Sequence, residues 1–446
     1  MSTRLEWAPL PRVHVSELSY ERFLREFALP KRPCILVGAS EGWAASERWG
    51  DLAYFRQADK VNQAQKVSLT TLKDPFHPEL EREKTVKLST ALDQLASAAA
   101  ASAAPEPEPE STVAGQGTSA VSSASTGANT LRYIKTWDYV RGGSGSLQED
   151  FSVPSLFDRS PTTLSEQAVL GNSKTDMKWL YIGEAGTGSG THIDTNNSSA
   201  WLWVARGRKR WRCVHGGDWH HFSEGQPQCD PMSGGRLNAI LASEPNSERS
   251  AKLGEDMEGE GDGDSESDDF DEEDTQIELP DLFGADADDG RVLARFPQLR
   301  VVRLFEGVQE AGDICFNPTQ CIHAVHNLEF TVSLTHNYID ASNLGDALRD
   351  LLNSWREDRA MVREMTKAER ERFWSELFGR PREQLPSAML EVGELVGASA
   401  VEAAIEAAAQ GDEEVAALLH CTLAPAVAEV RAELRGLVDE FLELLM

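Results

Sequence analysis

The sequence is poor in cysteine, and its six cysteines are too far apart for the usual zinc-binding motifs. No two of them form a C-x-x-C pair, which excludes the common zinc fingers. So few cysteines in a chain of 446 residues also provide no disulfide framework. We therefore expect a reducing compartment, with the cytoplasm as the first location and the nucleus as the second.

The chain also lacks long hydrophobic runs and an excess of basic residues. It begins with MSTRLEWAPLPRV, which has no apolar stretch typical of a signal peptide, and no apolar run elsewhere looks long enough to span a bilayer. The net charge is −30, which argues against non-specific binding to nucleic acid. We expect a soluble protein that contacts neither membranes nor nucleic acid directly and that suits a basic partner.

Two stretches lack the apolar residues needed for a folded core. The first, residues 97–129, is rich in Ala, Ser, Pro and Glu, and the second covers about residues 244–290. Between Glu255 and Asp274, 13 of 20 residues are acidic and none is basic. A calcium loop is excluded there because Ser267 stands where the turn requires glycine. Both stretches are predicted to be disordered inserts.

These inserts divide the chain into four parts. Residues 1–96 flank the core, residues 97–129 are the first insert, and residues 130–341 form the core, which the acidic insert interrupts. Residues 342–446 show apolar spacings of three and four, which predict a C-terminal helical domain. The predicted fold class is mainly β with α-helices added at both ends.

Local signals refine the two flanking parts. The N-terminal part should contain a helix at Tyr20–Phe27 and a buried strand at Cys34–Val37. In the C-terminal part, Thr366–Glu369 reads T-K-A-E, a capping box that opens a helix. Gly411 and Pro425 are expected to interrupt the last fifty residues, which would then form two or three helices.

The main candidate metal-binding motif is the H-x-D triplet of His192 and Asp194. Side chains two residues apart on a β-strand share a face, so the imidazole and the carboxylate would point to one place. A third ligand from a distant strand, His323, would complete the two-His-one-carboxylate set that holds Fe(II) and leaves positions open. His326 is the rival third ligand, but it has the opposite strand parity to His323, so only one of them can face the metal.

Lys209 is a candidate anion-binding residue. In a strand, Arg208, Arg210 and Arg212 would share the wet face, and Lys209 would lie on the apolar face. A lysine in a core needs an anion to keep its charge, and a dicarboxylic acid would supply one. The alternative is a solvated basic run or a nuclear-localisation patch.

The segment Phe330–Tyr338 alternates strictly between apolar and polar residues. One interpretation is a half-buried strand whose polar face is in water. The other is a strand of a small barrel whose polar face lines the lumen. The Gly-rich turn before His192 contains Ser189, which could donate a hydrogen bond there, although the glycines are equally compatible with a simple tight turn.

The chain resembles the JmjC family of Fe(II)- and 2-oxoglutarate-dependent oxygenases at four motifs, GTGSGTHID, GRKRW, EAGDICFNP and HNLEFTVSLTHNY. The resemblance implies a double-stranded β-helix of the jelly-roll, cupin-like type. It also implies a set of site residues: His192, Asp194 and His323 as iron ligands, and Lys209, Thr335, Ser189 and Tyr133 as contacts of 2-oxoglutarate. Leu202 stands where many members carry an asparagine, so that contact with the cosubstrate would be missing.

Within the family, the HNL and THNY pieces, the YIKTWD segment and the helical tail look most like the JmjC lysyl hydroxylases of the translation release factor. A second similarity, through HID and G-x-KRW, is to the phosphatidylserine-receptor-like arginine demethylases and lysyl hydroxylases. The resemblance implies hydroxylation of a lysine in a basic protein segment, with Fe(II), 2-oxoglutarate and O2. The alternatives are a protein N-methyl demethylase and a non-catalytic cupin-like binding protein. A homodimer formed through the C-terminal helices is a further expectation.

Overall fold

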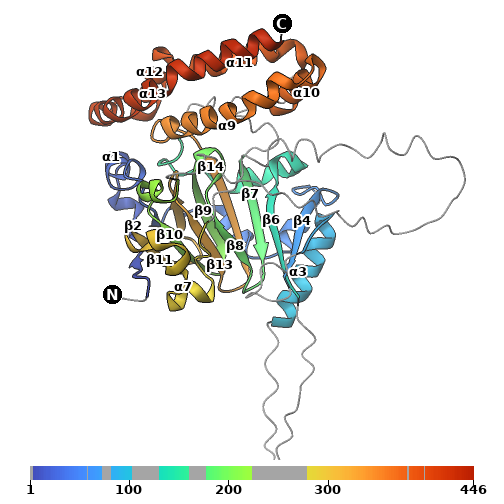
Figure 1. The fold of residues 1–446 in the computed structure, drawn as a ribbon. Coiled ribbons are helices and arrows are strands. Elements are labelled where there is room, and N and C mark those ends of the chain that lie inside the picture. Colours follow the sequence, from blue (N-terminus) through green and yellow to red (C-terminus); the bar gives the residue numbers. More distant parts are fainter. Residues whose placement is uncertain are drawn as a thin grey trace, which may run out of the picture.

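The computed structural model describes residues 4–57, 59–72, 82–102, 130–159, 177–223, 279–378, 381–395 and 397–445 (Figure 1). Most residues of both predicted inserts lie outside the part of the chain that the structure describes. Their predicted bounds need correction, because residues 97–102 belong to helix α3 (Leu88–Ser102). Similarly, residues 279–290 are described and contain helix α7 (Ala285–Asp289).

Two β-sheets make up the core of the described chain. The smaller sheet has the order β1 (Ala8–Pro9), β11 (Leu304–Gln309), β10 (Lys209–Val214), β13 (His323–Asn327) and β8 (Gly188–His192). The larger sheet has the order β2 (Arg12–His14), β3 (Cys34–Val37), β12 (Ile314–Asn317), β9 (Ser199–Arg206), β14 (Thr331–Tyr338), β7 (Lys178–Gly183), β6 (Leu131–Asp138), β4 (Lys66–Leu72) and β5 (Arg82–Lys87). Neighbouring strands are often far apart in sequence, as in a jelly roll, and the predicted fold class is confirmed.

The apolar side of the larger sheet is covered by aromatic residues from the N-terminal part. Trp203 of β9 lies 5.1 Å from Trp43 and 5.8 Å from Trp49, measured between ring centroids. Leu334 of β14 is fully buried in the same cluster. Because this side is filled by large side chains, the polar residues of β14 turn towards the interior between the sheets, together with Ala200 and Leu202 of β9.

The predicted N-terminal helix, buried strand and capping box are confirmed. Helix α1 (Tyr20–Phe23) continues as the π-helix η2 (Leu24–Ala28), and strand β3 has the predicted bounds. At the start of α10 (Lys367–Phe378), the Thr366 backbone N–H donates to Glu369 Oε2 at 2.7 Å, and the Glu369 N–H donates to Thr366 Oγ1 at 3.4 Å. This is the predicted capping box.

The prediction that Pro425 breaks a helix is wrong. Helix α13 (Glu413–Leu445) runs through it, although a proline inside a helix removes one hydrogen bond. Leu423 and Val427 are buried on either side of Pro425, so packing of the apolar stripe holds the two halves together. Gly411, with φ of +87°, does separate α12 (Ala398–Ala409) from α13.

The C-terminal helices lie together at one end of the β core (Figure 1). Helix α9 (Leu344–Glu364) leads into this region, where Trp355 packs 5.5 Å from Phe441 of α13. Contrary to the expectation from sequence, α13 is long and apolar enough to cross a membrane by length and composition. A single helix of this kind is weak evidence for a membrane span, because the core helices of soluble proteins can have the same length and composition.

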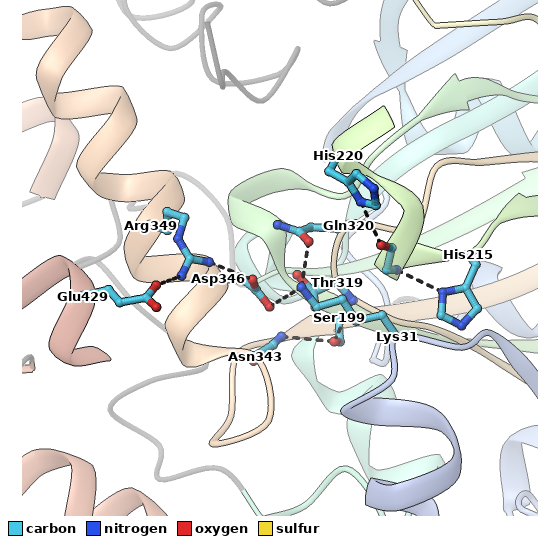
Figure 2. Close-up of polar contacts among 11 residues, drawn as sticks. Lys31, Ser199, His215, His220, Thr319, Gln320, Asn343, Asp346, Arg349 and Glu429 are labelled. Carbon is cyan, nitrogen blue, oxygen red and sulfur yellow. Dashed lines mark hydrogen bonds and ion pairs between the residues drawn. The ribbon is translucent and has the colours of Figure 1, made fainter. Parts of the chain in front are cut away.

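Polar contacts fasten the start of α9 to the β core (Figure 2). Lys31 Nζ lies 2.8 Å from Asp346 Oδ2 and donates to Gln320 Oε1 at 2.7 Å. Asn343 Nδ2 donates to Ser199 Oγ at 3.1 Å. The helical region is therefore tied to the first residue of β9 and to the loop that follows β12.

Candidate metal centre

Three potential metal ligands converge at the edge of the smaller sheet. His192 ends β8, His323 begins β13, and the two residues are direct cross-strand partners, with ring centroids 4.2 Å apart. Asp194 follows two residues after His192. One ligand atom from each of the three residues lies within 4.8 Å of the other two. The structure thus brings together the three residues that the sequence singled out.

Backbone carbonyls orient both histidine rings. His192 Nδ1 lies 2.7 Å from the Gly190 carbonyl oxygen, and His323 Nδ1 lies 2.9 Å from the Cys321 carbonyl oxygen. Because a carbonyl can only accept, each Nδ1 carries the hydrogen, and each Nε2 keeps its lone pair for a metal. Burial, and then the neighbouring His192, hold the pKa of His323 well below its usual value. The His323 ring is therefore neutral at physiological pH, as a ligand must be.

His326, the rival third ligand, does not belong to this group. Its ring stacks on Phe283 with centroids 3.9 Å apart and an interplanar angle of 19°. Burial lowers its pKa, which favours the neutral ring. The ring packs on the segment that precedes α7. The parity argument for His323 is consistent with this placement.

A cavity of about 280 Å³ adjoins the three residues. Its walls include all four residues predicted to contact a cosubstrate, namely Lys209, Thr335, Ser189 and Tyr133. Leu202 also lines the cavity, so an apolar side chain occupies the place where the resemblance would have put an amide. The potential metal ligands and the predicted anion-binding residues thus border the same cavity.

A β-bulge explains how Ser189 and His192 can both line this cavity although they are three residues apart. The pairing of β8 with β13 shifts between His323 and Val325, so that Val325 lies opposite Ser189 and His323 opposite His192. The extra residue on β8 returns the side chain of Ser189 to the face of His192. Strand parity alone would have placed the two side chains on opposite faces.

Lys209 is buried at the wall of the cavity, with 1% of its surface exposed. Its Nζ donates to Asn327 Oδ1 at 2.8 Å and lies 5.8 Å from the centroid of the Tyr133 ring. Burial lowers the pKa of Lys209 to about 7, and no carboxylate of the described residues pairs with it. An anion entering the cavity would restore the charged form, because an opposite charge raises a lysine pKa.

The neighbouring arginines follow the predicted pattern only in part. Arg212 was expected on a wet face, but only 4% of it is exposed. Its Nη1 donates to the Leu282 carbonyl oxygen at 2.8 Å, and its guanidinium lies over the rings of Trp7 and Phe283. The prediction failed because the segment after the acidic insert covers the outer face of β10.

The polar face of β14 points into the protein and not into water. Thr335 and Asn337 line the cavity and are 6% and 7% exposed. Thr335 Oγ1 donates to the Trp201 carbonyl oxygen at 3.2 Å, and Asn337 Nδ2 donates to Ser198 Oγ at 3.0 Å. Of the two interpretations of this strand, the lumen-lining one is correct.

The donor set fits an iron site with an anionic cosubstrate. Two neutral imidazoles and one carboxylate are the ligands of the facial Fe(II) triad. On the cavity wall, the buried ammonium of Lys209 offers a partner for a carboxylate, and the hydroxyl of Thr335 is close to the same space. The residues present therefore suit both Fe(II) and a small dicarboxylic acid.

Two asparagines and a tyrosine at this site were not predicted from the sequence. Asn317 Nδ2 donates to Asp194 Oδ2 at 2.6 Å, and Asn327 holds Lys209 as described. Tyr181 lines the cavity, and burial raises its pKa. Asn317 stands at the end of an otherwise apolar strand, ICFN, a polar interruption that could have drawn attention to it. Asn327 and Tyr181 reach the site because of the register between strands, which cannot be predicted from the local sequence.

The sequence matches the family described as Cupin-like domain over residues 20–343, more than half of the chain. It is 24% identical over 358 residues to the arginine-specific demethylase JMJ22 of Arabidopsis thaliana, covering 76% of this chain and 48% of that protein. It is 23% identical over 351 residues to the 2-oxoglutarate and iron-dependent oxygenase JMJD4 of Homo sapiens, covering 75% and 62%. A shorter similarity, 22% over 208 residues, is to the bifunctional arginine demethylase and lysyl-hydroxylase psr-1 of Caenorhabditis elegans, covering 45% and 40%. The chain therefore spans less than two thirds of the length of each of these relatives.

The burial of Lys209 predicts a pH-dependent effect of Lys209→Met on stability. The pKa of Lys209 is about 7 in the folded protein and 10.5 ordinarily. Between these values the unfolded chain binds more protons, so the stability of the wild type rises with pH. The methionine variant should therefore gain most over the wild type at or below pH 7, and the gain should shrink towards pH 10. Urea unfolding of both proteins at about pH 6.5 and pH 9.5 measures this difference. A gain that is the same at both pH values would contradict the burial of an unpaired ammonium.

Proposed function

The chain belongs to the family of Cupin-like domain proteins, and on this premise we propose that it is an Fe(II)- and 2-oxoglutarate-dependent protein hydroxylase. The observation that carries the proposal is the convergence of His192, Asp194 and His323 beside the buried Lys209. The names of the relatives support this choice, since JMJD4 is named a 2-oxoglutarate and iron-dependent oxygenase and psr-1 a bifunctional arginine demethylase and lysyl-hydroxylase.

In this proposal each side chain has a defined task. His192, Asp194 and His323 hold Fe(II), and Lys209 binds the far carboxylate of 2-oxoglutarate with the help of Thr335. Tyr133 and Ser189 complete the walls of the pocket. Together, bound iron and 2-oxoglutarate supply the chemistry that oxidises a C–H bond with O2. The protein orients the ligands, limits the access of water and places the substrate carbon.

We propose lysine in a basic segment as the substrate, with a translation release factor as the specific candidate. The net charge of −30 favours a basic partner. Within the described residues the one cluster of His, Cys, Asp and Glu with metal-binding spacing is the proposed iron site, so no separate zinc module of the kind that accompanies many histone demethylases is found there. We place the reaction in the cytoplasm, with the nucleus as a second location, and the described cysteines are all free thiols, which fits either compartment.

A second candidate function is protein N-methyl demethylation. It is favoured by the similarity to JMJ22, which is named an arginine-specific demethylase. Hydroxylation and demethylation begin with the same oxidation of a C–H bond, so both need the same iron ligands and cosubstrate contacts. They differ in the product, which is hydroxylated in one case and has lost a methyl group in the other. A cupin-like protein that only binds its partner is a third candidate, and it would not consume 2-oxoglutarate.

We further propose that the chain forms a homodimer through α13. The face of α13 opposite its buried stripe carries small exposed residues, including Ala417, Cys421, Ala428 and Ala432. In an antiparallel pair of these helices, Ala417 would meet Ala432, and Glu414 would meet Arg435 of the second copy. Sedimentation equilibrium should show a dimer that Ala428→Glu dissociates. A wild-type protein that stays monomeric at tens of micromolar would refute this pairing.

The proposed reaction predicts a mass increase of one oxygen atom on the release factor. Incubation with enzyme, Fe(II), 2-oxoglutarate and O2 should produce it together with succinate, and His192→Ala should abolish both because one of three iron ligands is lost. Intact-mass spectrometry of the release factor measures the product. Loss of a methyl group from a methylated histone peptide, with no gain of oxygen on any lysine, would favour the demethylase. Absence of iron-dependent succinate with every basic peptide would favour a binding protein.

Lys209→Ala is expected to raise the KM for 2-oxoglutarate about ten- to hundredfold, the range for losing a buried hydrogen bond to a charged group. Arg208→Ala is the matched control, since Arg208 is partly exposed and pairs with Glu329 away from the cavity. Steady-state succinate formation at several 2-oxoglutarate concentrations gives both values. Equal KM values for Lys209→Ala and Arg208→Ala would show that Lys209 does not bind the cosubstrate.

A further inference from the structure

We propose that Asn317 is a positioning residue that fixes the Asp194 carboxylate so that one oxygen is presented to the metal. This inference rests on the proposed iron site and adds a residue to it. Asn317 comes from the larger sheet, whereas His192 and His323 come from the smaller one. Its side chain therefore joins the two sheets at the metal centre.

The contacts of Asn317 define its task. Its Nδ2 donates to Asp194 Oδ2 at 2.6 Å and lies 3.1 Å from His323 Nδ1. Since His323 Nδ1 gives its own hydrogen to the Cys321 carbonyl oxygen, it cannot accept one from Asn317. The amide hydrogen is thus directed at Asp194. With Oδ2 engaged, Asp194 Oδ1 is the oxygen left for the metal.

A carboxylate needs such a restraint because its terminal torsion is broad. Asp194 also lies where the chain leaves β8 for the short helix η8 (Thr195–Asn197), so it is not part of a paired strand. A charge-assisted hydrogen bond is among the stronger ones in proteins. One donor in a fixed place can therefore select one orientation of the carboxylate.

Asn317 itself is firmly held. It is 2% exposed, and β12 is paired with β3 on one side and with β9 on the other. The loop that follows is also anchored, because the Thr319 N–H donates to Ser199 Oγ at 3.1 Å and Gln320 accepts from Lys31 (Figure 2). Asn317 therefore has a fixed backbone, and the anchored loop after it leads directly to His323.

A purely structural role does not explain why position 317 carries an asparagine. Its Oδ1 is buried and has no hydrogen-bond partner among the described residues, and a buried unpaired amide oxygen is unfavourable. Valine has a similar volume and would fill the place without that cost. A locally unfavourable polar group beside a ligand is expected where function requires the donor.

Asn317→Val tests the proposal through metal affinity, and Asn337→Val is the matched control. Asn337 lines the same cavity but donates to Ser198 and not to a ligand. With the full-length metal-free protein, the dissociation constant for Co(II) should rise about ten- to hundredfold in Asn317→Val, the usual effect of losing a partner of a metal ligand. The visible absorption spectrum of bound Co(II) should also change. Asn337→Val should keep both the affinity, within about twofold, and the spectrum.

Each outcome has a separate meaning. Unchanged Co(II) affinity and spectrum in Asn317→Val, or equal weakening in both variants, would overturn the role of Asn317 and leave the iron site intact. Failure of the wild type to bind Co(II) would instead contradict the proposed function. Thermal unfolding of the metal-free proteins checks folding. If the valine variant does not fold, Asn317→Ala carries the same test with the same expected loss of affinity.

Discussion

The direct pairing of His192 with His323 between β8 and β13 is the constraint on which the rest of the site depends. A slip of one residue in this register would send one imidazole to the other face of the sheet. The same two strands place Ser189 and Val325 on the cavity wall, and β13 also pairs with β10, which positions Lys209 opposite Asn327. One set of backbone hydrogen bonds therefore arranges both the proposed metal ligands and the proposed anion-binding residue.

The interior between the sheets contains two buried polar groups that lower the stability of the folded protein. Lys209 is buried without a carboxylate among the described residues, and the amide oxygen of Asn317 is buried without a partner there. Both features are unfavourable in the empty protein. An anion that enters the cavity would give Lys209 a charged partner, whereas the cost at Asn317 accompanies the amide donor that holds Asp194. The aromatic cluster around Trp43, Trp49 and Trp203 supplies the apolar burial that offsets such costs.

Strand parity was a sound guide from the sequence, because it depends on two-residue alternation alone. It put Lys209 in the interior and separated His323 from His326. His192 and Asp194 do converge, but β8 ends at His192 and Asp194 precedes η8, so strand alternation does not account for their meeting. Strand parity failed where a distant segment intervened, as at Arg212 under Leu282, and helix breaking at Pro425 failed because packing overrode propensity. The contact of Asn317 with Asp194 could not be predicted, because it joins the larger sheet to the segment that follows β8 of the smaller sheet.

The most direct test of this account is the position of a metal ion in the folded protein. Crystals grown with Mn(II) as a stand-in for Fe(II) would show the ion by its anomalous scattering. The account predicts a single strong peak bonded to His192 Nε2, His323 Nε2 and one oxygen of Asp194, facing the cavity that contains Lys209. A peak bound by other residues, or a site in which any of these three side chains points away from the ion, would contradict it.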